Sequence, residues 1–248
     1  MPDPPLYTAA STTHWQWGTM AEIRVMLTAA FKEAYLELVP GFERATGHEV
    51  TSLWVSTVQV MSRLQSWDAA ADAADIVIMS AAGLDALMAA GLVAARHNLA
   101  TSGIGVAVRA GAPRPDITSG SALQRAVLAA ESIVYSTGPS GVYLAALFER
   151  MGIAAAIAHK VKQVQGEPAG AVVARGEAQI GFQQVCELLP VPGIDFVGPL
   201  PDDVQEITTF CAGILTASKV PQAARELLEF FTEPHAAPVI RRKGMEPA

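Results

Sequence analysis

The sequence predicts an α/β protein made of two lobes. Strand-like apolar runs alternate with helical patterns along nearly the whole chain, which implies parallel sheets covered by helices on both faces. The length of 248 residues and the hydrophobic content of 51% are enough for one sizeable core or two modest ones. A strand and two helices remain after a second α/β unit is complete, so they can return to the first lobe.

The first α/β unit starts where regular patterning begins, just after Met20. Strands are expected at residues 23–28, 50–55 and 76–79, and helices at residues 32–46, 58–67 and 84–90. In the first of these helices Tyr35, Val39 and Phe42 recur at helical spacing. Gly47 follows this helix at the position where glycine commonly ends one.

The second α/β unit surrounds a segment rich in glycine and proline at residues 111–116. Its expected strands are residues 104–109, 133–135, 180–182 and 195–197, and its expected helices are residues 122–130, 141–151 and 168–175. The remaining strand at 208–215 and the helices at 221–232 and 234–243 then complete the first lobe. The predicted division is a flexible tail at 1–19, a first lobe of residues 20–104 and 209–248, and a second lobe of residues 105–208.

Composition excludes several classes of function. The net charge of −7 and the pI of about 5.2 oppose binding to nucleic acid. The longest apolar stretch, residues 86–95, is too short to cross a bilayer, which needs about 20 residues. Residues 1–19 lack the parts of a secretory signal, so we expect the protein as written in the cytoplasm, and in the periplasm only if the true start differs.

No cofactor or metal site is predicted. Cys186 and Cys211 lie far apart in sequence, and the five histidines form no paired set with metal-ligand spacing. The Gly103-Ile104-Gly105 run lacks the third glycine and the following helix of a dinucleotide fingerprint. We therefore expect neither a bound metal nor a nucleotide cofactor.

Five segments spread over most of the chain carry a family resemblance. They are residues 23–30 followed by 32–34, 38–47 (LVPGFERATG), 74–78 (ADIVI), 173–181 (VARGEAQIG) and 237–240 (APVI). In these segments the chain resembles the molybdate-binding-like branch of the type 2 periplasmic binding proteins. The resemblance implies the type 2 fold: two α/β lobes, a hinge of two strands, and a ligand cleft between the lobes, where the carboxyl ends of the strands meet helix N-termini. One relative in this class is an aconitate isomerase, which shifts a double bond in a tricarboxylate.

The turn after residue 135 is the main candidate for binding an anion. Ser136, Ser140 and Gly141 lie between a predicted strand and a predicted helix, where backbone N–H groups and hydroxyls converge on the positive end of the helix. The alternative is that Ser140 only caps the helix. Ser56 and Thr57 occupy an equivalent turn in the first lobe, with the same two interpretations.

Other candidate ligand contacts follow two further strands. Thr28, Ala29, Ala30 and Lys32 come after the first strand, although the classical molybdate binders have an Ala-Ala-Ser turn there, so the hydroxyl is displaced. Gln183 and Gln184 follow the 180–182 strand, and an inward amide offers both a donor and an acceptor to an oxygen-rich ligand.

Two main functions follow from these features. The first is a solute-binding protein of the ABC-transporter type, expected as a monomer, that closes on a small oxyanion or carboxylate and meets a transporter permease if it is exported. The second is a cytoplasmic isomerase of the aconitate isomerase type, which moves a proton and a double bond in a di- or tricarboxylate; the missing signal favours it. A third is a cytoplasmic ligand sensor. No catalytic residue is singled out, because no reactive base stands out beyond Lys32, Glu167 and Glu187, and this ranks binding first.

Overall fold

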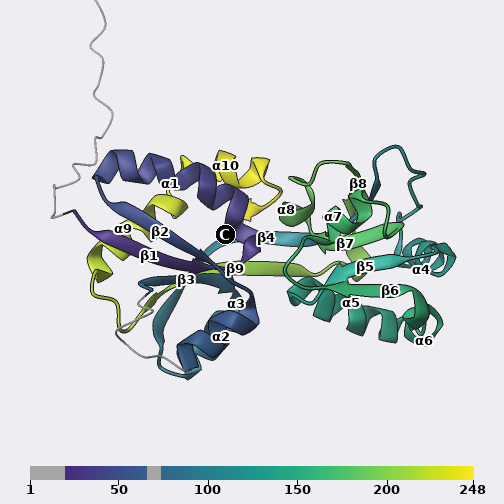
Figure 1. The fold of residues 1–248 in the computed structure, drawn as a ribbon, viewed down its shortest axis with the longest axis horizontal. Helices are drawn as coiled ribbons and strands as arrows, with labels where there is room; N and C mark the ends of the chain where they lie inside the picture. Colours follow the sequence, from purple (N-terminus) through teal and green to yellow (C-terminus); the bar gives the residue numbers. More distant parts are fainter. Residues whose placement is uncertain (1–19, 66–73) are drawn as a thin grey trace, which may run out of the picture.

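The computed structural model describes residues 20–65 and 74–248. The tail predicted at 1–19 and the last residues of the helix predicted at 58–67 lie outside the described residues. The described chain forms two lobes, each built on a β-sheet with helices packed against it (Figure 1). This arrangement confirms the predicted α/β class.

Strands and helices alternate through most of the sequence. The strands are β1 (Glu22–Leu27), β2 (Glu49–Trp54), β3 (Ile76–Ser80), β4 (Val93–Arg109), β5 (Ile133–Ser136), β6 (Val161–Val164), β7 (Ile180–Gln184), β8 (Ile194–Pro199), β9 (Ile207–Leu215) and β10 (Glu246–Pro247). The α-helices are α1 (Lys32–Thr46), α2 (Thr57–Gln65), α3 (Ala81–Ala89), α4 (Gly120–Ala129), α5 (Pro139–Arg150), α6 (Ala154–Ile157), α7 (Ala169–Ala174), α8 (Val185–Leu188), α9 (Pro221–Thr232) and α10 (Ala236–Arg242). Short 3-10 turns are η1 (Ala29–Phe31), η2 (Ala158–Lys160) and η3 (Asp202–Val204).

The sheet of the first lobe has the strand order β2-β1-β3-β9-β4, with β10 paired to β4. Strands β1, β2 and β3 are parallel, and β9 runs antiparallel to both β3 and β4. The side chains of β3 alternate between two cores: Ile76 and Ile78 pack with α1, α9 and α10, whereas Val77 and Met79 pack with α2 and α3. Helices therefore cover both faces of this sheet, and the two C-terminal helices belong to its core.

The sheet of the second lobe has the order β6-β5-β7-β4-β8. Strands β5, β6 and β7 are parallel, and β4 pairs antiparallel with β7 and β8. One core lies under α4 and α5 and includes Leu123, Leu144 and Phe148. A smaller core lies under α7 and includes Val134 and Val173.

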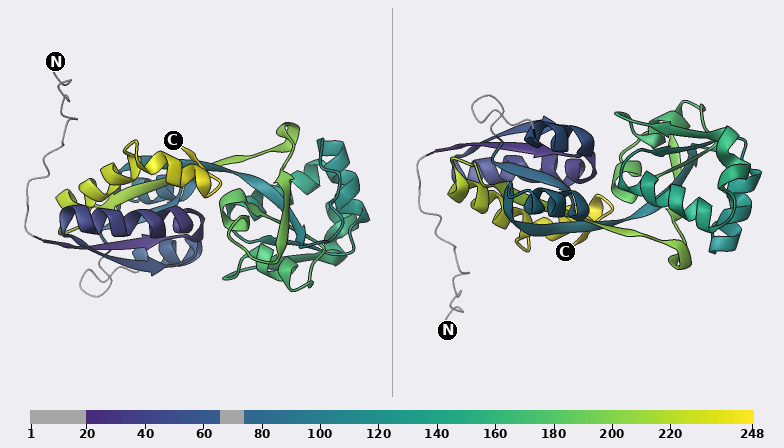
Figure 2. Two further views of the ribbon diagram at one scale, coloured as in Figure 1. Left: turned by 90° about the horizontal axis from the view of Figure 1, so that it is seen from above. Right: turned by 90° about the horizontal axis from the view of Figure 1, so that it is seen from below.

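Two strands connect the lobes. The first part of β4, through Gly103, pairs with β9, and the part from Ile104 onward pairs with β7 and β8. The Gln205 side chain holds the second crossing against the first, because its oxygen accepts from Ile104 N at 2.8 Å and its nitrogen donates to Ile104 O at 3.0 Å. Figure 2 shows these two strands running between the lobes in both views.

Several short or polar elements were not predicted from the sequence. Strand β4 begins at Val93 rather than at the predicted residue 104, because the exposed residues Arg96, His97 and Asn98 interrupt its apolar pattern. The elements β6, α6 and α8 were not predicted: β6 contains the exposed polar residues Lys162 and Gln163, and a single helical turn such as α6 or α8 has no measurable period.

Hydropathy identifies no single helix, within the described ranges, that could cross a membrane; a bent pair, Pro139–Arg150 and Ala154–Lys160, passes the same test of length and composition only when its halves are joined.

Candidate functional site

The carboxyl ends of the parallel strands of both lobes are the candidate site. In the first lobe Leu27 lies beside Trp54 and Ile78, so β1, β2 and β3 end at one edge. In the second lobe β5 and β7 end together at Ser136 and Gln184. In Figure 1 these two edges point toward each other across β4 and β9. The contact between α8 of the second lobe and η1 of the first brings the two edges together.

The turn after β1 offers a hydroxyl and free amides. Thr28 donates its backbone N–H to Ile78 O at 3.0 Å, while its side chain makes no capping bond and is partly exposed. The exposed Ala29 and the buried Ala30 open the 3-10 turn, where the first N–H groups have no partner within the turn. Lys32 is exposed, and its ammonium lies 5.6 Å from the centre of the Trp54 ring.

Ser80, which the sequence analysis did not single out, lies at the same edge. It ends β3 and precedes α3, yet its side chain makes no cap bond, and no other hydrogen bond to it occurs in the described part of the chain. The residue is only 8% exposed. The sequence signal for Ser80 is a serine in a strand-to-helix turn, which is also the reason for the prediction at Ser56.

The turn between β2 and α2 is a capping box. Ser56 Oγ accepts from Gln59 N at 3.2 Å, and Gln59 Oε1 accepts from Ser56 N at 2.8 Å. Thr57 follows as the first residue of α2 and is partly exposed. The capping interpretation therefore accounts for the Ser56 oxygen, whose hydroxyl hydrogen is still able to donate.

Ser140 is not the cap of α5. The N-cap is Gly138, followed by Pro139, so Ser140 lies inside the first turn of the helix. The residue is 2% exposed, and its side chain forms no hydrogen bond with the described residues. Ser136 Oγ accepts from Gly138 N at 3.3 Å and is partly exposed.

Gly141 lets α5 approach the end of β5 closely. A Cβ atom at this position would lie 1.6 Å from Ser136 O. Any side chain there would push the helix N-terminus away from the strand. The glycine thus sets the position of the amides and of the Ser140 hydroxyl.

Gln183 and Gln184, which were predicted to follow the strand, are the last two residues of β7, and both side chains make hydrogen bonds inside the protein. Gln183 Oε1 accepts from Ala169 N at 2.8 Å, and Gln183 Nε2 donates to Glu187 Oε1 at 3.0 Å. Gln184 lies in the hinge: oriented to satisfy its neighbours, its amide donates to Ser102 O and Gly103 O and accepts from Thr208 Oγ1 at 2.8 Å. Neither amide points freely at an open edge, so the structure gives both a structural role within the second lobe and the hinge.

Glu187 is the carboxyl with the most altered environment at this edge. Surrounding protein atoms desolvate it and raise its pKa from 4.5 to about 7, against the lowering effect of the Gln183 hydrogen bond. Its exposed surface is intermediate, so the carboxyl is enclosed on most sides yet still reachable. Only Gln183 hydrogen-bonds it within the described part of the chain.

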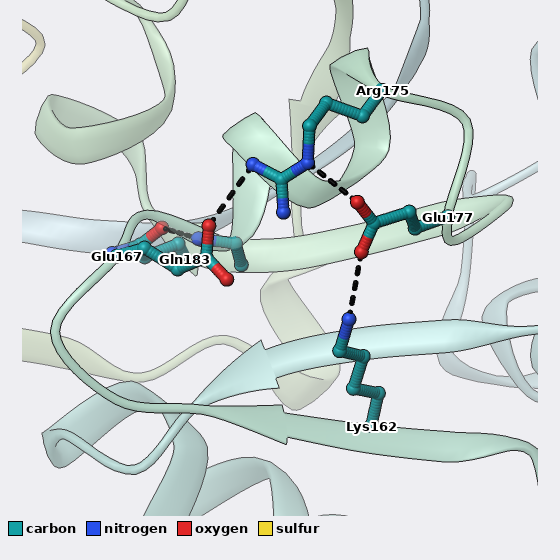
Figure 3. A network of polar contacts seen from close by, with 6 residues as sticks. Lys162, Glu167, Arg175, Glu177 and Gln183 are labelled. Carbon is teal, nitrogen blue, oxygen red and sulfur yellow. Dashed lines mark hydrogen bonds and ion pairs between the residues drawn. The ribbon is translucent and has the colours of Figure 1, made fainter.

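The other carboxylate candidate, Glu167, belongs to a surface ion-pair network. Arg175 contacts Glu167 at 3.0 Å and Glu177 at 2.6 Å, and Lys162 contacts Glu177 at 2.8 Å (Figure 3). The Arg175 guanidinium is the main reason that the pKa of Glu177 falls to about 2. Figure 3 shows Gln183 beside this network, with its carboxamide oxygen turned to the main chain.

The structure thus places the predicted turns of each lobe at one edge of its sheet. Thr28, Ala29 and Ala30 lie at the edge of the first lobe with Ser80, and Ser136, Ser140 and Gly141 lie at the edge of the second. No group of three or more histidine, cysteine, aspartate or glutamate side chains in residues 20–65 and 74–248 could hold a metal ion. Hydroxyls and amides without partners are the donors that a small anion needs.

Comparison with known proteins adds a family and a relative. The family model described as a bacterial extracellular solute-binding protein matches residues 23–246. An aconitate isomerase from Pseudomonas sp. is 41% identical over 246 residues, covering 96% of this chain and 92% of the relative.

Two solved structures share the fold. The periplasmic molybdate-binding protein of Azotobacter vinelandii superposes with a TM-score of 0.72 at 16% identity, covering 90% of this chain and 98% of that one. The sulfate-binding protein of Mycobacterium tuberculosis gives a TM-score of 0.72 at 18% identity, covering 92% and 87%. At these identities the likeness shows the fold alone, which is the type 2 periplasmic-binding-protein fold.

Proposed function

The chain belongs to the bacterial extracellular solute-binding protein family, and from this premise we propose that it is an isomerase that binds aconitate or a similar polycarboxylate between its lobes. The proposed reaction moves one proton and one double bond within the bound ligand. The ligand-binding part of the proposal agrees with the family and with the fold. The catalytic part goes beyond them.

One observation carries the proposal: the 41% identity with an aconitate isomerase extends over nearly the whole of both chains. The aligned region includes both lobes and the hinge, so the identity extends over the turns at the strand ends as well as over the cores of the lobes. The anion-binding neighbours share the fold at no more than 18% identity.

The chemistry of the site supports a carboxylate ligand. The buried hydroxyls of Ser80 and Ser140 have no partner in the described part of the chain, and an unpaired buried hydroxyl costs about 1–3 kcal/mol. A carboxylate that accepts from these hydroxyls and from the first amides of α5 would satisfy them with charge-assisted hydrogen bonds. A polycarboxylate has enough oxygens to contact both lobes at once.

The test is a binding and turnover experiment on the purified chain. Thermal shift and calorimetry with cis-aconitate, trans-aconitate, molybdate and sulfate measure which anion binds, and proton NMR of each aconitate with the protein measures whether the other isomer appears. Catalytic conversion, with the two isomers reaching the same equilibrium ratio from either side, supports the proposal. Tight aconitate binding without conversion would refute the catalytic part.

A second candidate is a solute-binding protein that only captures its ligand. The family description and the two oxyanion-binding neighbours favour it, and an exported form would then deliver the ligand to an ABC-transporter permease. In the same experiment this function predicts binding of molybdate, sulfate or a carboxylate with no change in the ligand.

A further inference from the structure

We infer that Glu187 is the catalytic residue that removes and returns the proton in the proposed isomerisation. The inference rests on the proposed function and adds the group that performs it. Four observations carry it: the place of its helix at the contact between the lobes, the partial exposure of the residue, the single hydrogen-bond partner of its carboxyl, and the contacts that the other candidate bases make elsewhere.

Helix α8 is where the second lobe docks on the first. It contacts η1, and Cys186, its second residue, is counted in the core of the first lobe together with Ala30 and Phe31. A Cβ atom on Gly244, in the loop before β10, would lie 2.6 Å from Leu189 Cδ1, so the packing there is close. Glu187 is the residue after Cys186 in α8, the helix that follows β7 directly and lies on the side of the second lobe that meets the first lobe (Figure 1).

The Glu187 carboxyl is held on one oxygen and left open on the other. Because Gln183 Oε1 accepts from Ala169 N, the amide nitrogen of Gln183 must face Glu187, and it donates to Oε1 at 3.0 Å. Oε2 has no hydrogen-bond partner within residues 20–65 and 74–248. Gln183 is a positioning residue here, and the open oxygen is the one available to a ligand.

Other groups of similar chemistry are used elsewhere. Lys32, at the end of η1, has its ammonium over the Trp54 ring, and Glu167, which precedes α7, is paired with Arg175. The Cys186 thiol next to Glu187 has its pKa raised by burial, so it stays protonated near neutral pH. Of the three bases that the sequence offered, only Glu187 is both partly enclosed and without a counterion in the described part of the chain.

The electrostatics agree with a base that works near neutral pH. A carboxyl with a pKa of about 7 is a stronger base than an ordinary glutamate and is still partly ionised near neutral pH, which is the balance that acid–base catalysis requires. Burial raises its pKa first and the Gln183 hydrogen bond lowers it second, and no charged side chain among residues 20–65 and 74–248 contributes.

The reaction balances without a cofactor. The Glu187 carboxylate takes a proton from the CH₂ carbon of the ligand, and the C–H electron pair becomes an allylic carbanion delocalised onto the neighbouring carboxylates. The protonated carboxyl then gives the proton to the other end of the three-carbon unit. One C–H bond breaks, another forms, the double bond moves by one carbon, and no oxidant, reductant or water is consumed.

The decisive variant is Glu187→Gln, which keeps the size and the acceptor oxygen for Gln183 but cannot take a proton. We expect kcat for aconitate to fall about 10²- to 10⁴-fold. The dissociation constant for propane-1,2,3-tricarboxylate, which has no double bond to move, should not rise, because the variant removes only a charge that repels the ligand. Glu167→Gln is the matched control and should keep both quantities.

Isotope exchange and pH separate a catalytic role from a structural one. In D₂O the wild type should exchange the CH₂ protons of aconitate as it isomerises it, and E187Q should lose exchange and isomerisation together. The kcat/KM profile should rise with an apparent pKa near 7 in the wild type. Glu187→Asp, which keeps a carboxyl on a shorter side chain, should retain part of the turnover, with a shifted apparent pKa in the kcat/KM profile. This variant provides the test if E187Q does not fold.

Each outcome separates the inference from the function on which it rests. If the wild type does not convert aconitate at all, the proposed function fails. If the wild type converts it and E187Q does so within about threefold, the function stands and the inference is wrong. Loss of turnover in E187Q with tricarboxylate binding intact supports both.

Discussion

Substitution of Ser140 by alanine tests the anion site directly. Ser140 is 2% exposed, its hydroxyl has no partner within the described residues, and the helix cap is Gly138 instead. A hydrogen bond from a buried hydroxyl to a charged ligand contributes about 1.5 to 3 kcal/mol, so S140A should raise the dissociation constant roughly tenfold to hundredfold. Stability should not fall, because the substitution removes an unsatisfied buried polar group.

The assay pairs calorimetry with thermal unfolding on the same preparations. Propane-1,2,3-tricarboxylate serves as the ligand, so that turnover does not disturb the heats. Ser119→Ala is the matched control, because Ser119 Oγ caps α4 by accepting from Ala122 N at 3.2 Å. That variant should lose about 1 kcal/mol, roughly 2 to 4 °C in Tm, with unchanged affinity. An S140A protein that keeps wild-type affinity, whatever its Tm, would refute the assignment of Ser140 to the site.

Three further predictions concern the frame of the site. Gly141→Ala should displace the N-terminus of α5 and weaken tricarboxylate binding more than S140A does, because its Cβ would lie 1.6 Å from Ser136 O; calorimetry showing normal affinity would contradict the close approach. Glu187→Gln should melt at the wild-type temperature near pH 4, below the unfolded-state pKa, but several degrees higher than the wild type at pH 8.5. The raised folded-state pKa of Glu187 makes wild-type stability fall by at most about 3 kcal/mol as pH rises from about 4.5 through 7. If the variant and the wild type had the same melting curve at both pH values, that linkage would be excluded. Gly244→Ala should lower Tm, since the residue has φ of +77° and packs against Leu189; an unchanged Tm would show that α8 is not tightly docked.

Much of the fold could be predicted because it rests on local patterns. The helix expected at residues 221–232 is α9 to the residue, and the strand expected at 76–79 extends by Ser80 alone. These segments have clear periods and clear ends. Strand β4 could not be delimited in this way, because the sequence gives no periodic signal for the polar residues that pair with β9 across the hinge.

The site was only partly predictable. The strand-end turns with Thr28 and Ser136 follow from the rule that open α/β sheets bind ligands at the carboxyl ends of their strands. The roles of Gln183 and Gln184 could not be read from sequence, because their partners Ala169 and Thr208 lie 14 and 24 residues away and meet them only in the folded protein. The cap of α5 was misplaced by two residues, since proline at the first helical position moves the cap to Gly138.

The cost of ionising Glu187 bears on what the protein does. A carboxyl whose ionisation lowers the stability of the folded protein is a poor structural element, because a glutamine would keep the hydrogen bond with Gln183 without that cost. Anion binding does not account for it either, since a negative side chain beside a bound carboxylate weakens binding. A proton-accepting role does account for Glu187, because such a group must be ionisable and must lie next to the anionic ligand. The bound anion would raise the pKa of Glu187 further. The pH at which kcat rises should therefore be higher than the pH at which kcat/KM rises. A purely structural carboxyl does not produce this separation.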